Sequence, residues 1–372
     1  MITPFKIAVP QADLDDLRTR LRSTRWPDRE TVGDESQGVR LAAMQSLIDR
    51  WAGGYDWRAC EAWLNANGNS KATIHGLEIQ FLHVRSPVAG ATPLLLTHGW
   101  PGSILEFRHV VGPLSDPEAF GGKAEDAFHL VIPSLPGFGY SERPSAAGCD
   151  LPEIARIWAD LMQGLGYDRW FAQGGDLGAG VATHMAVQGV KGLAGIHLNL
   201  PILFPPPIGD GEPEEAELSA ISDLIHYQKE LSGYSLQQST RPQTLGYSLS
   251  DSPVGQAAWI YEKLIEWSDG VPFPLDEMID NVMLYWLTGT ATSASRLYWE
   301  SFRKDFHWMP VELQTAVSIF HGDFFKPPRI WGERTYSNLV SWAEQPKGGH
   351  FAAWEQPQAF VDEIRRAFRL MR

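Results

Sequence analysis

The sequence of 372 residues predicts an α/β fold built on a mostly parallel, doubly wound sheet. Strand patterns alternate with helical patterns from residue 72 to residue 200, which is the order that βαβ units require. A helical stretch then interrupts this alternation, and strand patterns return after residue 314. Within the first part, an apolar run at 170–173 meets glycines around Asp176 and then a buried helical segment, which indicates strand, sharp turn and helix.

These patterns divide the chain into four stretches. Residues 1–70 are predicted as an N-terminal helical wrap, 71–200 as the first part of the sheet core, 201–305 as a helical lid and 306–372 as the second part of the core. We expect the lid to cover the edge where the strands end, because ligands bind there in such folds, and to create a dry pocket.

The composition excludes several classes of function. A hydrophobic content of 44% supports a substantial core, and a formal net charge of −14 would repel nucleic acid and an anionic membrane surface. Cys60 and Cys149 are too few for a disulfide framework and stand in no metal-ligand spacing. The N-terminus has no long apolar stretch, so neither a signal peptide nor a membrane anchor is expected. We therefore expect a cytoplasmic protein that uses no metal or other cofactor.

The N-terminal wrap is predicted from apolar residues at helical spacing in 12–21 and 39–48, with tryptophan-bearing loops between and after them, at Trp26-Pro27 and from Trp51 to Trp57. The sheet is expected to begin with a hairpin around Gly76, and the next core elements follow in the order strand, helix, strand, helix, elbow strand, helix and strand. Their predicted ranges are 72–75, 78–84, 93–97, 104–114, 128–136, 152–165, 170–174, 181–187 and 192–200.

The second half of the chain gives a helical lid and the end of the sheet. Proline and glycine are frequent in 201–213, and the helical patterns that follow contain few strand signals. The closing helix has apolar residues at helical spacing and starts near Pro357. The predicted lid helices are 214–231, 254–267, 275–286 and 293–302, and the later elements are strands at 315–320 and 339–342 and a helix at 358–371.

The turn at Asp176 carries the main chemical signal. Glycines two positions before and after Asp176 allow a strained turn that pushes the side chain out at the sheet edge, as in the nucleophile elbow of the α/β-hydrolase fold, which usually contains serine. A carboxylate here can attack carbon and form an alkyl ester, which suits a strained ring or a good leaving group. The alternative interpretation is a glycine turn in which Asp176 caps the next helix.

The order of three residues favours the hydrolase interpretation. Asp176, Asp323 and His350 each follow a predicted strand and reproduce the order nucleophile, acid and histidine of α/β-hydrolase triads. His350 lies in a glycine-flanked loop before the last helix, from which an imidazole can reach over the sheet edge. The sequence specifies Asp323 as the acidic member of the triad less strongly, because any loop aspartate can be a turn former. The other candidates for this position in the same region are Glu300, Asp305 and Glu333.

This set of residues predicts a two-step reaction. An aspartate ionised near neutrality attacks without a base, so His350 is needed only to activate the water that cleaves the ester, while Asp323 fixes its tautomer. The N–H groups of Leu177 and Trp100 are expected to hold the oxyanion that forms when water adds. Because these donors are backbone groups, we expect His98 to order its loop rather than to act as a catalyst.

Five motifs in this order resemble the microsomal-type epoxide hydrolases, and the resemblance spans nearly the whole chain. The N-terminal helices, with Leu14, Leu17 and Arg25-Trp26-Pro27, also resemble the N-terminal region of that family. The motifs are His98-Gly99-Trp100-Pro101-Gly102-Ser103, Gly174-Gly175-Asp176-Leu177-Gly178, Asp251-Ser252-Pro253-Val254-Gly255, Asn281-Val282-Met283-Leu284-Tyr285-Trp286 and 348–357, which begins Gly348-Gly349-His350-Phe351.

The resemblance implies that Asp176 opens an epoxide with water as the second substrate, and that two lid tyrosines protonate the epoxide oxygen. By local motif these are Tyr234 and Tyr298, since an alkoxide is too basic to leave without an acid. Trp100 and Trp299 suggest an apolar substrate. The resemblance leaves open the natural epoxide, a role in detoxification or biosynthesis, and the oligomeric state, for which a homodimer is one alternative. Some relatives have glutamate where this chain has Asp323.

Two other functions remain as alternatives. Haloalkane dehalogenases also use an aspartate elbow, but they typically place a halide-binding tryptophan directly after it, where this chain has Leu177. A non-catalytic binding protein of the same fold would keep the pocket and could lose the triad, whereas this sequence contains all three members. A serine esterase is disfavoured because the residue at the apex is not serine.

Overall fold

The computed structural model describes residues 2–201, 203, 212–270, 273–303 and 309–372. Within these ranges the strands form one nine-stranded sheet in the order β1-β2-β3-β5-β4-β6-β7-β8-β9. Neighbouring strands from β5 to β9 in this order are parallel, while the pairs β1–β2, β2–β3 and β3–β5 are antiparallel. The mostly parallel sheet of the sequence prediction is confirmed.

The strands agree closely with the predicted ones, except that two are longer, at 69–74 and 339–345, and one, at 2–4, is new. The hairpin around Gly76 is present, but its first strand starts at Asn69, and the segment at 2–4 pairs with that strand, although residues 1–70 were expected to be helical. The bounds are β1 Ile2–Pro4, β2 Asn69–Ile74, β3 Leu77–Val84, β4 Thr92–Thr97, β5 Phe128–Pro133, β6 Trp170–Gly174, β7 Leu193–Leu198, β8 Thr315–Phe320 and β9 Leu339–Gln345.

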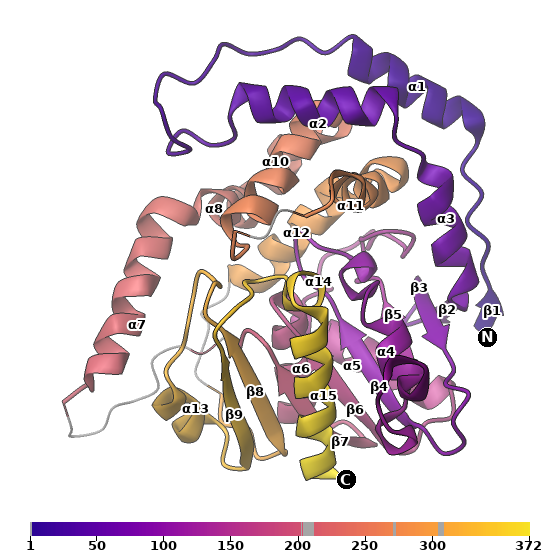
Figure 1. Ribbon diagram of the computed structural model, residues 1–372, viewed down its shortest axis with the longest axis vertical. Helices are drawn as coiled ribbons and strands as arrows, with labels where there is room; N and C mark the ends of the chain where they lie inside the picture. Colours follow the sequence, from indigo (N-terminus) through magenta and orange to yellow (C-terminus); the bar gives the residue numbers. More distant parts are fainter. Residues whose placement is uncertain (1, 202, 204–211, 271–272, 304–308) are drawn as a thin grey trace.

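Helices cover both faces of the sheet, as a doubly wound arrangement requires. Figure 1 shows α15 (Pro357–Met371) in front of the sheet and α6 (Leu177–Val187) behind it, next to α5 (Leu151–Gly164). The closing helix α15 buries the apolar residues that the sequence pattern assigned to its inner face, among them Phe360 and Phe368. Its Phe368 ring lies 4.6 Å from the Phe171 ring of β6, measured between centroids, so the last helix is fixed against the strand that leads to Asp176.

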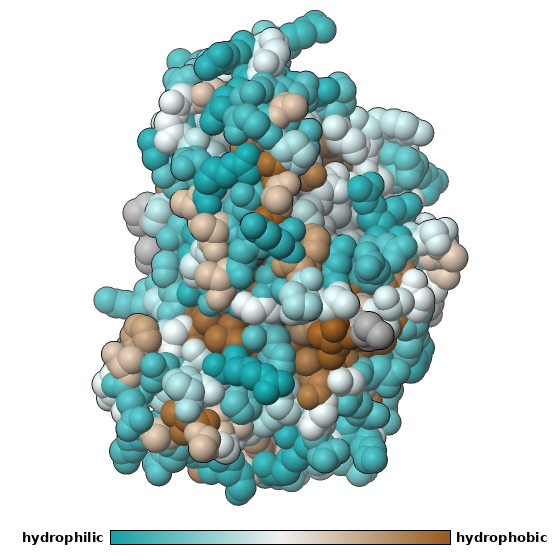
Figure 2. All heavy atoms as spheres, turned by 90° about the vertical axis from the view of Figure 1, so that its right-hand side faces the viewer, coloured by the Kyte–Doolittle hydropathy of each residue, from teal (hydrophilic) through white to brown (hydrophobic). Residues whose placement is uncertain are grey.

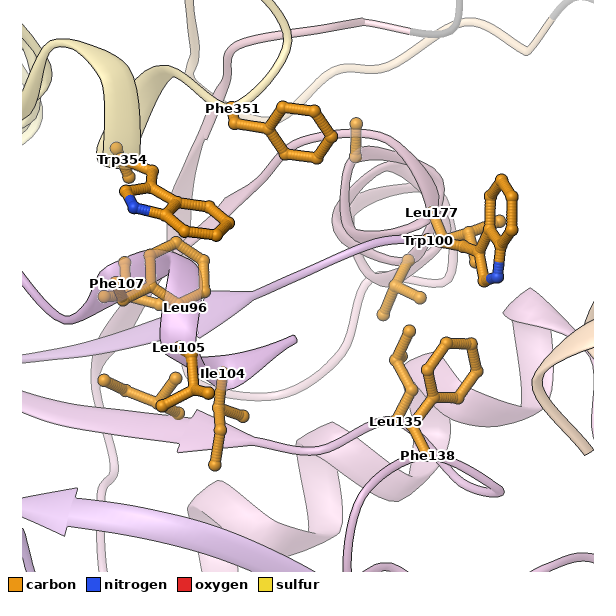
Figure 3. Close-up of a cluster of buried hydrophobic side chains, with 14 of the residues drawn as sticks. Leu96, Trp100, Ile104, Leu105, Phe107, Leu135, Phe138, Leu177, Phe351 and Trp354 are labelled. Atoms are coloured by element: carbon orange, nitrogen blue, oxygen red, sulfur yellow. The ribbon is translucent and has the colours of Figure 1, made fainter. Parts of the chain in front are cut away.

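The central strands are apolar on both faces because helices cover both sides of a parallel sheet. Every residue of β6 and of β8 is buried. Figure 3 shows a part of this core near the ends of the strands, where Leu96 of β4, Leu177 of α6 and Trp100 belong to one cluster of buried side chains. The sheet therefore supplies a rigid base under the loops that follow its strands.

The predicted helix at 104–114 is wrong as a single element. The chain forms a 3-10 turn, η1, at Ile104–Phe107 and a short helix, α4, at Val111–Ser115. Pro113 has no N–H to donate to a carbonyl one turn earlier, so a continuous α-helix through it would lose a hydrogen bond. In the N-terminal stretch, Trp51 belongs to α2 (Leu41–Gly53) rather than to a loop, and Trp57 begins α3 (Trp57–Ala66).

The stretch between β7 and β8 contains helices, as its pattern predicted, and two of them were missed. The polar sequence at 232–251 has no strong apolar stripe, so α8 and α9 were not predicted. The helices of this stretch are α7 Glu215–His226, a π-helical turn η4 at Tyr227–Leu231, α8 Gly233–Thr240, α9 Pro242–Asp251, α10 Pro253–Glu266, α11 Leu275–Thr288 and α12 Ala291–Phe302. The shorter helices of the C-terminal part are α13 Arg329–Thr335 and α14 Ala352–Glu355.

The N-terminal helices pack on helices of the stretch between β7 and β8. Figure 1 shows α1 (Gln11–Arg22) and α2 lying above α10 and α11. The Tyr55 hydroxyl donates to Asp280 Oδ1 at 2.6 Å, and Arg108 Nη2 lies 2.7 Å from Asp280 Oδ2. The Asp280 carboxylate therefore joins the N-terminal helices, helix α11 and the loop after β4 at one buried point.

The face of the molecule turned to the viewer in Figure 2 is mostly hydrophilic, with hydrophobic residues in separate small areas. Within the described ranges, none of the helices combines the length and the apolar character that a bilayer span requires.

Replacing Asp280 with alanine is expected to lower the free energy of unfolding by about 3–5 kcal/mol, because the buried Arg108 charge would lose its partner. Asp276→Ala is the matched control, since Asp276 pairs with Arg50 at 2.6 Å but both side chains are nearly half exposed. That change should lower the free energy of unfolding by at most about 1 kcal/mol. Urea unfolding of the two variants measures the difference, and equal losses would contradict the assigned role of the Asp280 cluster.

Candidate active site

Asp176 lies at the sharp turn between β6 and α6, with φ 52° and ψ −128°. This positive φ is rare for a residue with a side chain, and the surrounding structure maintains it. A Cβ on Gly178 would lie 2.0 Å from the Thr97 carbonyl oxygen, and one on Gly174 would lie 2.1 Å from the Gly178 oxygen. The small residues of the motif are therefore required because the turn packs directly against the backbone of β4.

The carboxylate of Asp176 turns toward the loop after β4 and does not cap α6. It forms no side-chain capping hydrogen bond with that helix, so the alternative of a simple N-cap is not what the geometry shows. Instead, the Trp100 N–H donates to Asp176 Oδ1 at 2.9 Å, and the Leu177 N–H also favours the ionised carboxylate. Gly99 permits this approach, because a Cβ there would lie 2.2 Å from Asp176 Oδ1.

His98 orders this loop, as the sequence predicted. Its Nδ1 lies 2.9 Å from the Gly99 carbonyl oxygen, and its Nε2 accepts from the Leu135 N–H at 3.2 Å. Burial lowers the pKa of His98 to about 4, so the ring is neutral and carries its proton on Nδ1. Two further side chains from α11 hold the same loop: Asn281 Nδ2 donates to Pro101 O at 2.8 Å, and the Tyr285 hydroxyl donates to Gly102 O at 2.6 Å.

The structure brings the three residues of the predicted triad together. His350 Nδ1 lies 3.2 Å from Asp323 Oδ1, and His350 Nε2 lies 3.7 Å from Asp176 Oδ2. They come from three loops that follow β6, β8 and β9, so the parallel strand ends place them at one edge of the sheet.

The competing acids are placed elsewhere or are outside the described part of the chain. Glu300 accepts from the Gly148 N–H at 3.1 Å, and Glu333 pairs with Arg329 at 2.7 Å on the surface. Asp305 lies outside the described residues. Of the candidate acids that the structure describes, Asp323 is the one beside His350.

Electrostatics couple the two carboxylates to the imidazole. Burial disfavours a charged imidazole, but the hydrogen-bonded Asp323 carboxylate and then Asp176 outweigh it and raise the pKa of His350 to about 9. Burial raises the pKa of Asp176, opposed by His350 and by the N–H groups of Leu177 and Trp100. Near neutral pH, His350 is therefore a cation that favours the ionised form of Asp176.

The loop that carries His350 is fixed by side chains that the sequence did not single out. Glu355 accepts three backbone N–H groups, from Asp269 at 2.8 Å and from Gly349 and Phe351 at 3.0 Å each. The His350 N–H donates to the Trp267 carbonyl oxygen at 2.9 Å. Glu355 belongs to the 348–357 motif, and its position one helical turn after the loop was the available signal.

The two predicted tyrosines lie together over Trp100. The Tyr234 ring stacks on the Trp100 ring at 4.9 Å and 8°, and the Tyr298 ring meets Trp100 edge-on at 5.9 Å. Burial is the main cause that raises the pKa of both phenols well above the ordinary value, with Asp176 adding to it. Both are therefore neutral donors at neutral pH, close enough to Asp176 to interact with its charge.

Trp299 is not part of this group. It is half-buried and lines a separate cavity of about 390 Å³ with residues such as Pro144, Cys149 and Arg241. Its ring faces the Arg303 guanidinium at 4.8 Å. The structure thus places Trp100 with the predicted catalytic residues and Trp299 away from them.

Behind Asp176 lies a small polar chamber of about 20 Å³, which is enough for one water molecule. The Thr97 hydroxyl and Gln173 Oε1 are buried without a hydrogen-bond partner in the described part of the chain, and both residues line this chamber. Sequence reasoning missed Glu106, which also lines it; burial raises the pKa of Glu106 to about 8. The other lining residues include Asp176, His350 and Asn199.

A carboxylate at a strand-to-helix elbow, paired with a histidine at the edge of a mostly parallel sheet, defines an α/β hydrolase in which aspartate takes the apex position. Comparison with known proteins gives the same class: the family described as alpha/beta hydrolase fold matches residues 92–219, and the one described as epoxide hydrolase N terminus matches residues 2–107.

Similar proteins narrow this class to one family. The chain is 53% identical to a candidate epoxide hydrolase of Stigmatella aurantiaca, over 100% of this chain and 86% of that protein. It is 33% identical to epoxide hydrolase 1 of Sus scrofa, over 100% of this chain and 89% of that protein. The structure of Aspergillus niger epoxide hydrolase superposes with a TM-score of 0.91 at 31% identity, covering 100% and 97% of the two chains. The chain belongs to the epoxide hydrolase family.

Proposed function

We propose that this enzyme converts an apolar epoxide to a vicinal diol through a covalent ester on Asp176, with His350 as the base of the hydrolytic step and Asp323 as the carboxylate that orients it. One observation carries the proposal: Oδ1 of Asp176 is held by the Trp100 N–H, while Oδ2 faces His350 Nε2 at 3.7 Å. This arrangement orients an ionised carboxylate before any substrate binds.

In the first step, an Asp176 oxygen forms a bond to one epoxide carbon while the bond from that carbon to the ring oxygen breaks. The ring oxygen takes a proton from Tyr234 or Tyr298, so an alcohol leaves the carbon instead of a strongly basic alkoxide. The phenols suit an oxygen leaving atom, whereas a halide would need no acid. This preference, together with Leu177 after the nucleophile, argues for epoxide opening over dehalogenation.

The second step follows from the change in charge at Asp176. Once Asp176 is an ester, it no longer holds a proton on His350 by charge attraction, so the pKa of His350 falls from its resting value of about 9. The neutral imidazole then takes a proton from water, and the hydroxide attacks the carbonyl carbon of the ester. The N–H groups of Trp100 and Leu177 receive the oxyanion. Its collapse breaks the bond between the carboxyl carbon and the alkyl oxygen, that oxygen takes the proton held by His350, and the diol leaves with Asp176 restored. The chamber that Asp176 and His350 line is the proposed position of this water.

The wider assignments are part of the same proposal. Residues 201–305 act as a lid, and the contacting rings of Trp100, Tyr234 and Tyr298 form an apolar wall for the epoxide carbon skeleton. Cys60 and Cys149 are both free thiols, which suits the reducing cytoplasm. The protein is proposed to be either a monomer or a homodimer. Sedimentation of the purified protein distinguishes the two.

A single turnover in heavy-oxygen water tests the covalent route. Excess enzyme is mixed with a small aryl epoxide in H2(18)O, and the diol and the peptide that contains Asp176 are analysed by mass spectrometry. Since water attacks the carboxyl carbon of the ester, the label should enter Asp176 and be largely absent from the diol of the first turnover. Label found directly in the diol, with none in the Asp176 peptide, would refute the ester.

A further inference from the structure

A third phenol stands behind the two predicted acids. The Tyr227 hydroxyl oxygen lies 3.0 Å from the Tyr234 hydroxyl oxygen, within hydrogen-bond distance. Tyr227 begins the π-helical turn at Tyr227–Leu231, which ends two residues before α8. This wider turn connects α7 to α8, and such turns are frequent at functional sites.

The Tyr227 ring is fixed by the same aromatic stack that holds the catalytic histidine. It stacks on Phe324 at 5.1 Å and 20°, and Phe324 in turn contacts the His350 ring at 5.4 Å and 30°. The Tyr234 ring is fixed as well, between Trp100 at 4.9 Å and the Lys263 ammonium at 5.2 Å. Neither ring is free to turn away, so the contact between the two hydroxyl groups is built into the site.

The three tyrosines differ in their access to water. Tyr234 and Tyr298 are buried, while Tyr227 is half-buried. Burial is the main cause that raises the pKa of Tyr227, so this residue is also a neutral phenol with a proton to donate.

A phenol has one proton, and this limits what Tyr234 can do. If Tyr234 donates its O–H to Tyr227, it has none for the epoxide oxygen. If Tyr227 donates to the Tyr234 oxygen, the Tyr234 proton is free for the substrate, and the phenolate that forms on Tyr234 already accepts a hydrogen bond. Such a bond is stronger to a charged oxygen than to a neutral one, so it favours the ring-opening transition state over the ground state.

We propose that Tyr227 is a positioning residue for ring opening, whose O–H donates to the Tyr234 oxygen and afterwards returns a proton to it. In the return step, the Tyr227 proton moves to the Tyr234 phenolate, and Tyr227 recovers a proton from solvent water, which leaves hydroxide to be neutralised by the bulk. This inference rests on the proposed role of Tyr234 as an acid.

Tyr227→Phe keeps the ring on Phe324 and removes only the hydroxyl. We expect the rate constant of ester formation, measured by rapid quench with excess enzyme, to fall about 10-fold, as the loss of one hydrogen bond predicts. The rate constant of ester hydrolysis and the dissociation constant of the epoxide should change little. If the substitution instead disturbed packing, it would act through Phe324 on His350 and lower the rate constant of ester hydrolysis. A lower rate constant of hydrolysis with an unchanged rate constant of ester formation would therefore overturn the inference.

Tyr140→Phe is the matched control, because the Tyr140 hydroxyl is buried without a hydrogen-bond partner in the described ranges. It should leave both rate constants unchanged. In a Tyr234→Phe background, adding Tyr227→Phe should cause no further loss, whereas full additivity of the two changes would overturn the inference. Failure of the proposed function would be seen separately, as unaltered ester formation in Tyr234→Phe alone.

Discussion

His350→Gln is expected to stop the reaction after ester formation and to leave the opened epoxide bound to Asp176. The Asp176 carboxylate attacks without a base, whereas cleavage of the ester needs a group that takes a proton from water. General-base catalysis typically contributes about 10²–10⁴-fold, so hydrolysis should slow by that factor while ester formation continues. Ester formation should slow as well, but less, since His350 also favours the ionised form of Asp176.

Mass spectrometry of the protein provides the measurement. About one equivalent of epoxide should be consumed in a burst, and the mass of the Asp176 peptide should increase by the mass of the epoxide. Asp176→Ala is the control, because it has no carboxylate to alkylate and should show neither adduct nor burst. If His350→Gln also shows no adduct, His350 acts before the ester forms and the assigned role is wrong.

The same reasoning gives a pH dependence for hydrolysis in the unmodified enzyme. Asp176 is one of the carboxylates that raise the pKa of His350 to about 9, and esterification removes its charge. The hydrolysis rate constant should therefore increase with pH and level off below pH 9, as the imidazole loses its proton. A rate constant that stays flat between pH 6 and about 9 would contradict a histidine base with this perturbed pKa.

The double change Tyr234→Phe and Tyr298→Phe is expected to slow ester formation by about 10²–10⁴-fold, because no phenol would remain to protonate the epoxide oxygen. Each single variant should lose less, since the other tyrosine still lies beside Trp100. The phenylalanine rings keep the stacking, so the effect isolates the two hydroxyl groups. Burial of both phenols explains why solvent cannot easily substitute for them.

Rapid-quench measurement of the Asp176 ester compares these variants with Tyr247→Phe, which changes an exposed tyrosine on α9 and should have no effect. Hydrolysis of any ester that does form should proceed at the normal rate, because His350 and Asp323 are unchanged. Normal ester formation in the double variant would remove Tyr234 and Tyr298 from the mechanism.

Sequence patterns could predict those parts of the site that depend on chain order. Asp176, Asp323 and His350 follow strands of one parallel sheet, and parallel strand ends meet at one edge, so their proximity followed from the alternation of strands and helices. The position of the loop that supplies the Trp100 N–H followed from the same argument, because this loop also follows a parallel strand. Strong apolar runs and stripes likewise predicted the central strands and α15, since burial on both faces or on one face leaves a clear pattern.

Other parts depend on the direction of individual side chains, which the patterns do not contain. Tyr298 and Trp299 are neighbours on α12, and adjacent helical residues point about 100° apart, so one faces Trp100 and the other faces a different cavity. Glu106 and Tyr227 were missed for a related reason. Each becomes part of the site only through the packing of a turn, η1 or η4, whose shape no periodic pattern specifies.

Helix α11 connects regions that the chain order keeps far apart. Asp280 on this helix is bound by Tyr55 and Arg108, while its neighbour Asn281 and, one turn on, Tyr285 hold the carbonyl groups of the two residues after Trp100. Any shift of α11 would thus move the N–H that orients the nucleophile. A search for variants with a changed preference between mirror-image epoxides should therefore include the segment around Tyr55, although Tyr55 does not line the chamber at Asp176.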